Sequence, residues 1–246
     1  MARTNASIKA HYEEGHDYTS DGNEEEATIL SYIEPWGSVF EIGCGDGSFA
    51  NRMACENHND VDAIDYVRHS DWADIEGFPS ELSSVIFREI DLSKCPPEYR
   101  PLVVMKGVLE HMDDPYATLK QIVRRFCPQQ IITSSPSFLN PRGYIWMALQ
   151  YLLGYEMSLA DLHFILPSDM EAWAEKIGYD IEYKSVDQDW GHGERLIEDF
   201  KKRLPKVFKD IEADIPKFME WLEKTLPYHN YTDSSGATIV YNLRRK

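Results

Sequence analysis

Residues 39–49 read VFEIGCGDGSF, the pattern of a buried strand that runs into a glycine-rich turn and then opens a helix. Three glycines at alternate positions, Gly43, Gly45 and Gly47, let the backbone adopt positive φ angles and let a ligand approach main-chain N–H groups. The N-terminus of the following helix adds a favourable site for polar ligand groups. The segment therefore predicts a cradle for a cofactor.

The spacing of these glycines narrows the class of cofactor. A dinucleotide-binding fingerprint reads G-x-G-x-x-G, and its third glycine allows a helix to pack closely on a strand. In this chain the glycines alternate and residue 48 is Ser, so that pattern is not met. Glu41 precedes the first glycine, where a carboxylate favours a cationic ligand group over a pyrophosphate. S-adenosylmethionine has suitable charges, namely an ammonium and a sulfonium with only one carboxylate.

Two segments resemble one known family. The acidic-x-G-x-G-x-G pattern from Glu41 to Gly47 resembles motif I of the class I S-adenosylmethionine-dependent methyltransferases. Residues 105–115 read MKGVLEHMDDP and closely resemble the segment after strand four in methyltransferases of ubiquinone and menaquinone biosynthesis. The resemblance covers roughly residues 10–190 and implies an S-adenosylmethionine-dependent methyltransferase. The alternative for the first segment alone is a structural glycine turn of another α/β domain.

Apolar runs of strand length alternate with helical patterns, which indicates an α/β chain with a parallel sheet covered on both faces. Strands are expected at Ser38–Ile42, Val61–Tyr66, Val85–Ile90, Leu102–Lys106, Gln130–Thr133, Tyr179–Val186 and Ala237–Leu243, and helices at Ser48–Glu56, Pro115–Phe126 and Met170–Ile177. The resemblance implies a Rossmann-like, seven-stranded, mostly parallel sheet whose last strand is antiparallel. The sequence pattern itself adds a helical insertion before that strand.

Two helical segments carry further sequence signatures. Ser168 is the expected N-cap of the helix Met170–Ile177, with Glu171 completing a capping box and Gly178 ending the helix. The helical stretch Glu194–Leu226 has spaced aromatic residues that are expected to form one buried face. These aromatic residues are Phe200, Phe208, Phe218 and Trp221.

A length of 246 residues suits one α/β domain. The sequence shows no internal repeat and no low-complexity linker, so residues 1–246 are expected to form a single domain. Its expected parts are an N-terminal lid at about residues 1–35, an aromatic insert at about residues 136–166 and a helical insert at about residues 192–228.

Cofactor-binding residues are expected at the carboxyl ends of successive strands, where ligands bind in open α/β sheets. Asp65 ends the second strand and suits the ribose hydroxyls, while Asp91 follows the third strand and suits the adenine amino group. Their structural alternatives are a turn-initiating Asp and a helix N-cap, respectively. The resemblance adds the backbone of Lys106 and Gly107 at the methionine end. The full expected set is Tyr12, Tyr18, Glu41, Gly43, Cys44, Gly45, Gly47, Asp65, Tyr66, Asp91, Leu92, Lys106 and Gly107.

Tyr12 and Tyr18 belong to the expected lid, which relatives fold over the cofactor. A tyrosine face near a sulfonium contributes about 1 kcal/mol by cation–π attraction, and ordinary packing is the alternative. Relatives that bind a metal near the fourth strand place an acid three residues before Glu110, but this chain has Gly107 there. No catalytic metal is therefore expected.

Two histidines are candidates for a general base. Methyl transfer from a sulfonium is an in-line displacement, which needs a base only if the acceptor is protonated at neutral pH. His111 borders the expected reactive end, and the alternative is that Glu110 and His111 cap the next helix. His163 follows the aromatic insert and is the second candidate, with local hydrogen bonding in a loop as its alternative.

The composition limits the partners. With 25 Lys and Arg against 42 Asp and Glu, the formal net charge is −17, which disfavours nucleic acid and anionic membrane. The leading expectation is a small-molecule acceptor methylated at oxygen or nitrogen. A macromolecular acceptor, RNA or protein, and a non-catalytic cofactor-binding scaffold are the alternatives. A basic patch near the pocket would support the macromolecule, and its candidate members are Lys201, Lys202, Arg203 and Lys206.

The cysteines and the hydropathy of the sequence indicate where in the cell the protein is expected. The four cysteines are scattered without a C-x-x-C pair, which favours reduced thiols and a cytoplasmic setting. Residues 1–18 contain no apolar leader, and the longest apolar run, Tyr144–Leu153, is too short to span a bilayer. No membrane association is expected, and the oligomeric state stays open between monomer and homodimer.

Overall fold

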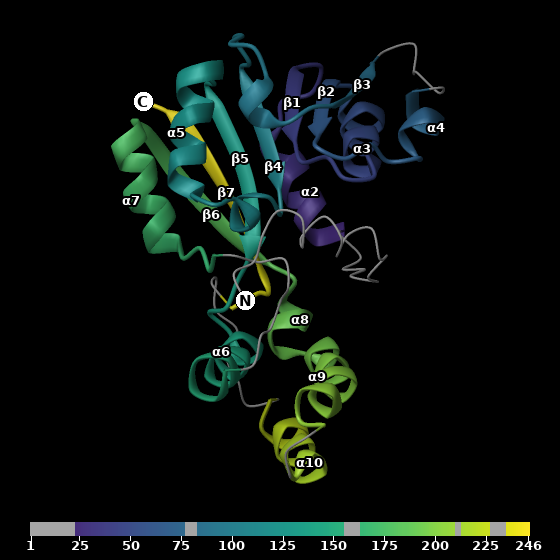
Figure 1. The fold of residues 1–246 in the computed structure, drawn as a ribbon, viewed down its shortest axis with the longest axis vertical. Helices are drawn as coiled ribbons and strands as arrows, with labels where there is room; N and C mark the ends of the chain where they lie inside the picture. Colours follow the sequence, from purple (N-terminus) through teal and green to yellow (C-terminus); the bar gives the residue numbers. More distant parts are fainter. Residues whose placement is uncertain (1–22, 77–82, 155–162, 210–212, 227–234) are drawn as a thin grey trace. The chain divides into compact units, whose positions relative to one another are not determined.

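The structure is a computed structural model that describes residues 23–76, 83–154, 163–209, 213–226 and 235–246. Its strands form one seven-stranded sheet in the order β3-β2-β1-β4-β5-β7-β6 (Figure 1). The strands are β1 Ser38–Ile42, β2 Asp60–Asp65, β3 Val85–Glu89, β4 Leu102–Lys106, β5 Gln130–Pro136, β6 Tyr179–Val186 and β7 Thr238–Arg245. Each lies within a few residues of its predicted bounds.

Strands β1 to β5 are parallel, and β1 lies between β2 and β4. Val39 of β1 pairs with Val61 on one side and with Leu102 on the other. The chain therefore builds the sheet outward from β1 through β2 to β3, and then returns to build the other half from β4. Ligands of open α/β sheets bind outside the carboxyl ends of the strands at such a reversal of strand order. The glycine turn follows β1 directly and so lies at this position.

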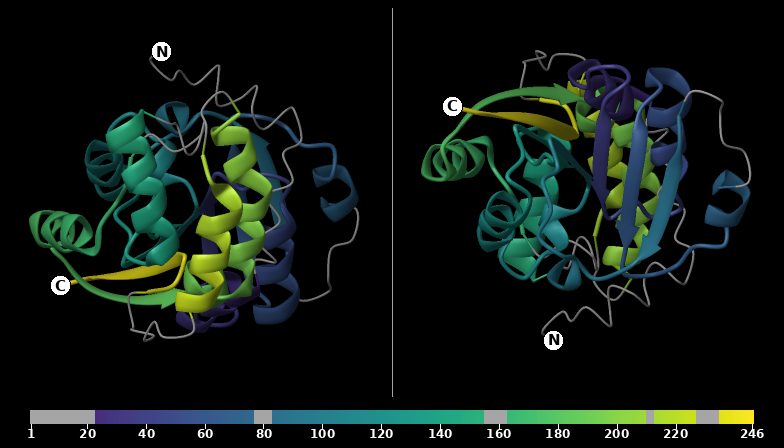
Figure 2. Two further views of the ribbon diagram at one scale, coloured as in Figure 1. Left: turned by 90° about the horizontal axis from the view of Figure 1, so that it is seen from below. Right: turned by 90° about the horizontal axis from the view of Figure 1, so that it is seen from above.

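The last strand, β7, runs opposite to its two neighbours (Figure 2). The N–H of Lys246, just after β7, donates to the carbonyl oxygen of Gly178, just before β6, at 3.1 Å. The N–H of Arg245 donates to the carbonyl oxygen of Gln129, just before β5, at 2.9 Å. The end of β7 thus meets the beginnings of β5 and β6. This confirms the predicted seven-stranded, mostly parallel α/β sheet with an antiparallel last strand.

The chain divides into two compact units, Met1–Ser135 with Leu159–Tyr183 and Val240–Lys246, and Pro136–Ser158 with Lys184–Ile239. The described helices of the first unit are α2 Asn23–Tyr32, α3 Ser48–Asn57, α4 Trp72–Glu76, α5 Pro115–Phe126 and α7 Pro167–Ile177, with two 3-10 turns, η1 Leu92–Lys94 and η2 Leu109–His111. Those of the second unit are α6 Pro141–Leu153, α8 Gln188–His192, α9 Glu194–Val207 and α10 Ile215–Thr225. The single domain with its lid and inserts stays a prediction.

Helix α5 shows how local sequence places an element next to the site. The Asp114 carboxylate accepts from the N–H of Ala117 at 2.8 Å and caps the helix, while Pro115 occupies the first helical position, where no N–H is needed. Buried residues on one face, including Leu119 and Ile122, pack the helix onto the sheet. The end of the β4–α5 loop that leads into α5 is therefore fixed.

The expected start of α7 is wrong by a few residues. The helix begins at Pro167, and the Asp169 carboxylate accepts from the N–H of Leu166 at 3.0 Å, so Ser168 lies inside the helix rather than at its N-cap. Proline at the first helical position and an acid two residues later form an equivalent start signal. The predicted end is confirmed, because Gly178 has φ +82° and closes the helix.

The second unit has its own apolar core. Trp146 of α6 packs against Phe200 of α9 with a ring-centroid distance of 5.0 Å, and both are fully buried. The buried cluster consists of Trp146, Leu196, Phe200, Leu204, Met219 and Leu222. The expectation of one buried aromatic face is wrong for Trp221, which is 57% exposed. The predicted helical stretch consists of two helices, α9 and α10, so its aromatics do not share one helical face.

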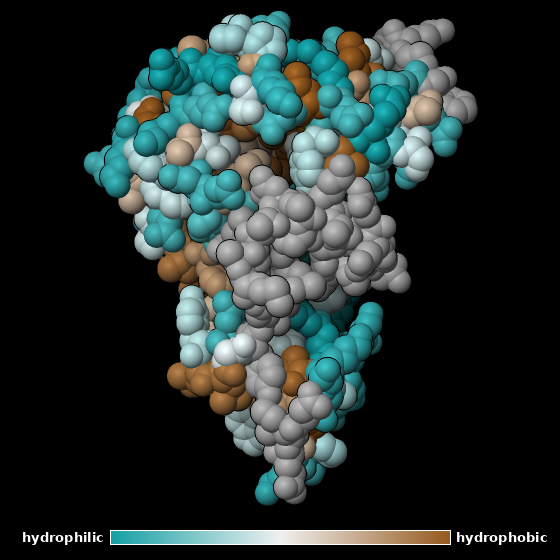
Figure 3. All heavy atoms as spheres, viewed as in Figure 1, coloured by the Kyte–Doolittle hydropathy of each residue, from teal (hydrophilic) through white to brown (hydrophobic). Residues whose placement is uncertain are grey.

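The surface agrees with the composition. Hydrophilic side chains cover most of the visible face of the first unit in the space-filling view (Figure 3), which agrees with a sequence in which 27% of the residues are charged. The end of α6 is an exception, since Leu152 and Leu153 are 79% and 57% exposed. Among the described helices, none has both the length and the apolar character needed to cross a bilayer.

Candidate active site

The glycine turn adopts a conformation that only glycine takes easily. Gly43, Gly45 and Gly47 have φ angles of +75°, +54° and +85°. A Cβ atom on Gly43 would come within 2.5 Å of Val108, and one on Gly47 within 2.5 Å of the Phe87 ring. A Cβ on Gly45 would meet no described atom within 4 Å. The outer two glycines therefore allow close packing, while the middle one borders open space that a ligand can fill.

Asp65 holds the turn in place. One carboxylate oxygen accepts from the N–H of Gly45 at 3.0 Å and the other from the N–H of Val67 at 3.1 Å. The expected turn-forming role is thus present. A carboxylate has about four lone-pair positions, so two remain for hydroxyl donors. The arrangement fits a ribose with two free hydroxyls, and that contact stays a prediction.

Trp72 is a supporting residue that the sequence did not indicate. Its indole N–H donates to the carbonyl oxygen of Gly45 at 2.8 Å. Its ring stacks on Phe87 at 5.1 Å and 8°, and Trp72 is fully buried. Phe87 in turn fills the space that a side chain at Gly47 would need. Trp72 and Phe87 therefore hold the shape of the turn, through the contacts with Gly45 and Gly47 respectively.

Glu41 is a buried carboxyl group next to the turn. It is 1% exposed, and its Oε2 atom has no hydrogen-bond partner within the described part of the chain. Burial raises its pKa to about 8, with smaller contributions from the charges of Glu26, Asp46 and Asp65 in the same direction and Lys106 opposing. An unsatisfied buried oxygen is costly unless a ligand supplies a donor. Glu41 therefore fits a cationic donor such as an ammonium group.

The other predicted residues near the sheet edge have clear local roles. Asp91 caps η1 by accepting from the N–H of Ser93 at 2.7 Å, so the N-cap alternative is present; hydrogen bonds from Ser93 lower the pKa of Asp91. The N–H of Ile90 donates to the carbonyl oxygen of Asp65 at 2.8 Å and brings the two acids to adjacent strand ends.

Leu92 is half-buried and Tyr66 is 47% exposed. Burial raises the pKa of the Cys44 thiol, which remains protonated.

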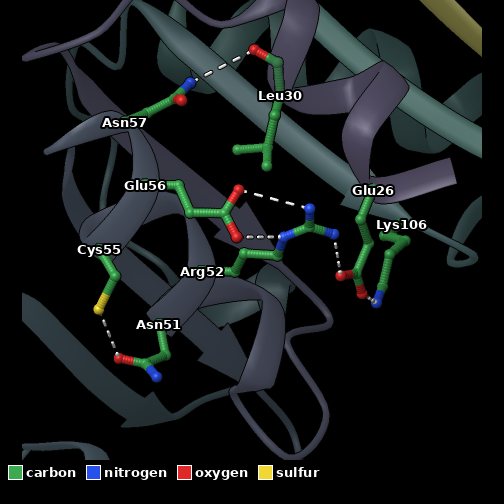
Figure 4. Close-up of polar contacts among 8 residues, drawn as sticks. All are labelled: Glu26, Leu30, Asn51, Arg52, Cys55, Glu56, Asn57 and Lys106. Atoms are coloured by element: carbon green, nitrogen blue, oxygen red, sulfur yellow. Dashed lines mark hydrogen bonds and ion pairs between the residues drawn. The ribbon is translucent and has the colours of Figure 1, made fainter. Parts of the chain in front are cut away.

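Lys106 is the last residue of β4, and Gly107 follows it. The Lys106 ammonium pairs with the Glu26 carboxylate of α2 at 2.5 Å (Figure 4). Burial lowers the pKa of Lys106, but the hydrogen bond and charge of Glu26 outweigh burial and leave it raised. The N–H of Gly107 donates to the Ser134 hydroxyl at 3.1 Å. Gly107 can therefore offer a ligand its carbonyl oxygen rather than this N–H.

The two candidate bases come from distant parts of the sequence to one loop. His111 lies in η2, and the N–H of His163 donates to the carbonyl oxygen of the neighbouring Glu110 at 3.1 Å. The Nε2 atom of His163 lies 3.1 Å from the carbonyl oxygen of Asp113. Because a carbonyl only accepts, Nε2 carries the proton, and Nδ1 of a neutral ring carries the lone pair. His163 thus makes the local hydrogen bonds that were named as the alternative to a catalytic role. The same bonds also fix the orientation of its ring.

Tyr12 and Tyr18 lie outside the described residues. Within the ranges that the structure describes, no group of three His, Cys, Asp or Glu side chains is arranged to hold a metal ion. The expectation of no catalytic metal stays a prediction.

The sequence is similar to known methyltransferases. A family model described as a methyltransferase domain matches residues 18–184. Ubiquinone biosynthesis O-methyltransferase from Neisseria meningitidis serogroup A is 24% identical over 151 residues, which cover 58% of this chain and 63% of that protein. The same enzyme from a serogroup C strain gives an equal match. The matched segment therefore spans less than two thirds of these curated relatives.

Solved structures share the fold at low sequence identity. A methyltransferase from Geobacter sulfurreducens in complex with S-adenosylhomocysteine has TM-score 0.55 and 18% identity, covering 97% of this chain and 98% of that one. The mycolic acid cyclopropane synthase CmaA1 has TM-score 0.58 and 13% identity, covering 89% and 81%. The small RNA methyltransferase HEN1 has TM-score 0.59 and 14% identity, covering 90% and 25%. At these identities the likeness establishes the fold.

Proposed function

This chain belongs to the class I S-adenosylmethionine-dependent methyltransferases, and we propose that it transfers a methyl group to an oxygen or nitrogen of a small-molecule acceptor. The glycine turn and the segment at residues 105–115 predicted this family and its cofactor, S-adenosylmethionine. The match to the family model confirms both. The acceptor, and the activity of the whole protein, belong to the proposal.

The residues around the glycine turn fit the cofactor. The open space over Gly45 leaves room for a ligand against the main chain. The unsatisfied Oε2 of Glu41 suits the ammonium, and Asp65 retains acceptor capacity for the ribose hydroxyls. The bound cofactor supplies an electrophilic methyl group on a sulfonium. The protein has to hold this group in line with the acceptor atom.

The loop after β4 carries the proposal for the chemistry. His163 is oriented by the carbonyl oxygen of Asp113, so its Nδ1 is the atom that takes a proton from an acceptor hydroxyl or ammonium. A base held by a hydrogen bond on its second nitrogen is the usual arrangement of a catalytic histidine. His111 in the same loop is the other candidate. The observation that carries the proposed chemistry is this contact of His163 with the loop 109–113.

Charge supports a small acceptor over RNA. The net charge is −17, and the candidate basic patch on α9 is partly neutralised. Lys201 pairs with Glu223 at 2.6 Å, and Arg203 pairs with Asp199 at 3.5 Å. Named relatives include a ubiquinone biosynthesis enzyme and a small RNA methyltransferase, so the fold alone does not choose between these acceptors. A cytoplasmic location is part of the proposal, since all four cysteines are free thiols.

The proposal is tested by measuring S-adenosylhomocysteine formation with a panel of acceptors. The panel contains phenols, catechols, aliphatic alcohols and amines, with transfer RNA and an unmodified protein mixture as macromolecular arms. We expect turnover with at least one small molecule and none above background with RNA or protein. Turnover confined to a macromolecular arm, or cofactor binding without turnover in every arm, would overturn the small-molecule assignment.

A further inference from the structure

We propose that the Lys106 ammonium binds the carboxylate of the cofactor's amino-acid group, and so determines selectivity for ligands that retain this carboxylate. The inference rests on S-adenosylmethionine being the cofactor. The resemblance implied only a backbone contact from Lys106 at the methionine end. Its side chain would add a second, charged contact to the same ligand.

The position of the ammonium supports this role. Lys106 is the last residue of β4, and β4 pairs with β1 at the reversal of strand order. The Lys106 Nζ atom lies 5.0 Å from the centre of the Phe49 ring. Phe49 belongs to the first turn of α3, directly after the glycine turn. The ammonium therefore lies beside the cradle rather than on the outer surface, and its side chain is 27% exposed.

The lysine is held in place but keeps donors for a ligand. Glu26 accepts from Lys106 with one oxygen and from Arg52 with the other, at 3.1 Å, and Arg52 also pairs with Glu56 at 2.7 Å (Figure 4). The network anchors α2 to α3 and orients the lysine. An ammonium has three donors, so two remain after the bond to Glu26. Those two can bind a carboxylate oxygen.

The charges beside the turn match a zwitterion. Glu41 on β1 supplies a carboxyl group, and the positive charge of Lys106 lies close enough to oppose the rise of the Glu41 pKa. An amino-acid group carries an ammonium and a carboxylate on one carbon. A cation and an acid on adjacent parallel strands, β1 and β4, offer one partner for each. Lys106 already pairs with Glu26 and also feels the charges of Glu25 and Glu41. A ligand without the carboxylate satisfies Glu41 but adds no partner for Lys106.

The test compares two ligands on three proteins by isothermal titration calorimetry. The ligands are S-adenosylhomocysteine and its decarboxylated analogue, which keeps the ammonium, sulfur, ribose and adenine. The proteins are the native chain, Lys106→Met and Lys224→Met. Lys224→Met is the control. Lys224 also forms an ion pair at 2.5 Å, with Glu220, but on the exposed face of α10.

We expect the native chain and Lys224→Met to bind S-adenosylhomocysteine about 10- to 100-fold more tightly than the analogue, the range of a charge-assisted hydrogen bond. Lys106→Met should bind both ligands with the same weak affinity, and Lys106→Arg should recover part of the preference. Equal binding of both ligands by the native chain overturns the proposal even if Lys106→Met fails to fold. An unchanged preference in Lys106→Met also overturns it. Absence of binding to the native chain would instead overturn the cofactor assignment.

Discussion

The indole nitrogen of Trp72 lies 2.8 Å from the carbonyl oxygen of Gly45 and ties α4 to the middle of the glycine turn. Replacing Trp72 with Phe keeps an aromatic ring against Phe87 but removes this donor. A net hydrogen bond contributes about 0.5–1.5 kcal/mol, and a smaller ring adds the cost of a cavity. We expect the unfolding free energy to fall by about 1–3 kcal/mol and S-adenosylhomocysteine affinity to fall about 3- to 10-fold.

The measurements for Trp72→Phe are urea denaturation and calorimetric titration. Trp221→Phe is the matched control, because Trp221 is 57% exposed. It should change neither quantity by more than about 0.5 kcal/mol, as for most surface substitutions. Unchanged ligand affinity in Trp72→Phe would remove Trp72 from the support of the turn.

Gly45→Ala tests whether the open space over the turn is a ligand site. Gly45 and Gly154 both have positive φ, +54° and +71°, and neither would bring a Cβ within 4 Å of a described atom. Alanine at either position therefore carries only backbone strain of about 1–2 kcal/mol. We expect similar losses of stability in Gly45→Ala and Gly154→Ala, measured by denaturation. S-adenosylhomocysteine binding should weaken at least 10-fold in Gly45→Ala alone, and equal affinities would contradict a ligand over Gly45.

Glu41 makes stability depend on pH. Burial raises its folded pKa from 4.5 to about 8, so below pH 4.5 the group is protonated in both the folded and the unfolded chain. Between pH 4.5 and 8 the unfolded chain loses this proton first, which destabilises the fold by up to about 1.4 kcal/mol per pH unit. Above pH 8 the difference is constant. Glu41→Gln removes this dependence, so its stability relative to the native chain should rise from pH 4.5 to 8.

The same carboxyl group links cofactor binding to protons. A cationic ligand group favours the ionised form of Glu41, so binding at pH 7 should release up to one proton. Calorimetric titration of the native chain in two buffers of different ionisation enthalpy measures this release. Glu41→Gln should bind more weakly and release fewer protons. A native chain whose binding enthalpy is the same in both buffers would contradict the role of Glu41.

His163→Ala tests the proposed base. For an acceptor that is protonated at neutral pH, loss of a general base lowers the rate about 10²- to 10⁴-fold. His58→Asn is the control, because His58 caps the far end of α3 with φ +56°, which Asn adopts readily. We expect kcat to fall in His163→Ala and to stay near the native value in His58→Asn. A rate that falls in His111→Ala but not in His163→Ala would assign the base to His111.

Much of the cofactor side of the site was predictable from local sequence. β1 and β4 have the predicted bounds, because each is a short apolar run that ends at a glycine turn. Asp65 ends β2 and Asp91 follows β3, and parallel strands bring their carboxyl ends to one edge. These signals are contained in single segments. They need no knowledge of distant contacts.

Other features depend on contacts between distant residues. Trp72 is 27 positions from Gly45, in a short segment with no strong periodicity, so nothing local indicated their hydrogen bond. The contact of His163 with Asp113 spans 50 positions. The start of α7 was missed for a different reason. Ser168 and Pro167 are both possible start signals, and the bond from the N–H of Leu166 to the Asp169 carboxylate goes with the start at Pro167.

Asp65 provides the most direct test of the cofactor site, by calorimetric titration of S-adenosylhomocysteine. Asp65→Ala removes the carboxylate at the carboxyl end of β2, while the control Asp60→Ala removes one at the opposite end of the same strand. Each carboxylate accepts two hydrogen bonds, Asp65 from Gly45 and Val67 and Asp60 from the N–H and hydroxyl of Ser84. We predict one-to-one binding by the native chain and Asp60→Ala, and at least a 10-fold loss in Asp65→Ala. Absence of binding to the native chain, or equal affinity in both variants, would contradict the account.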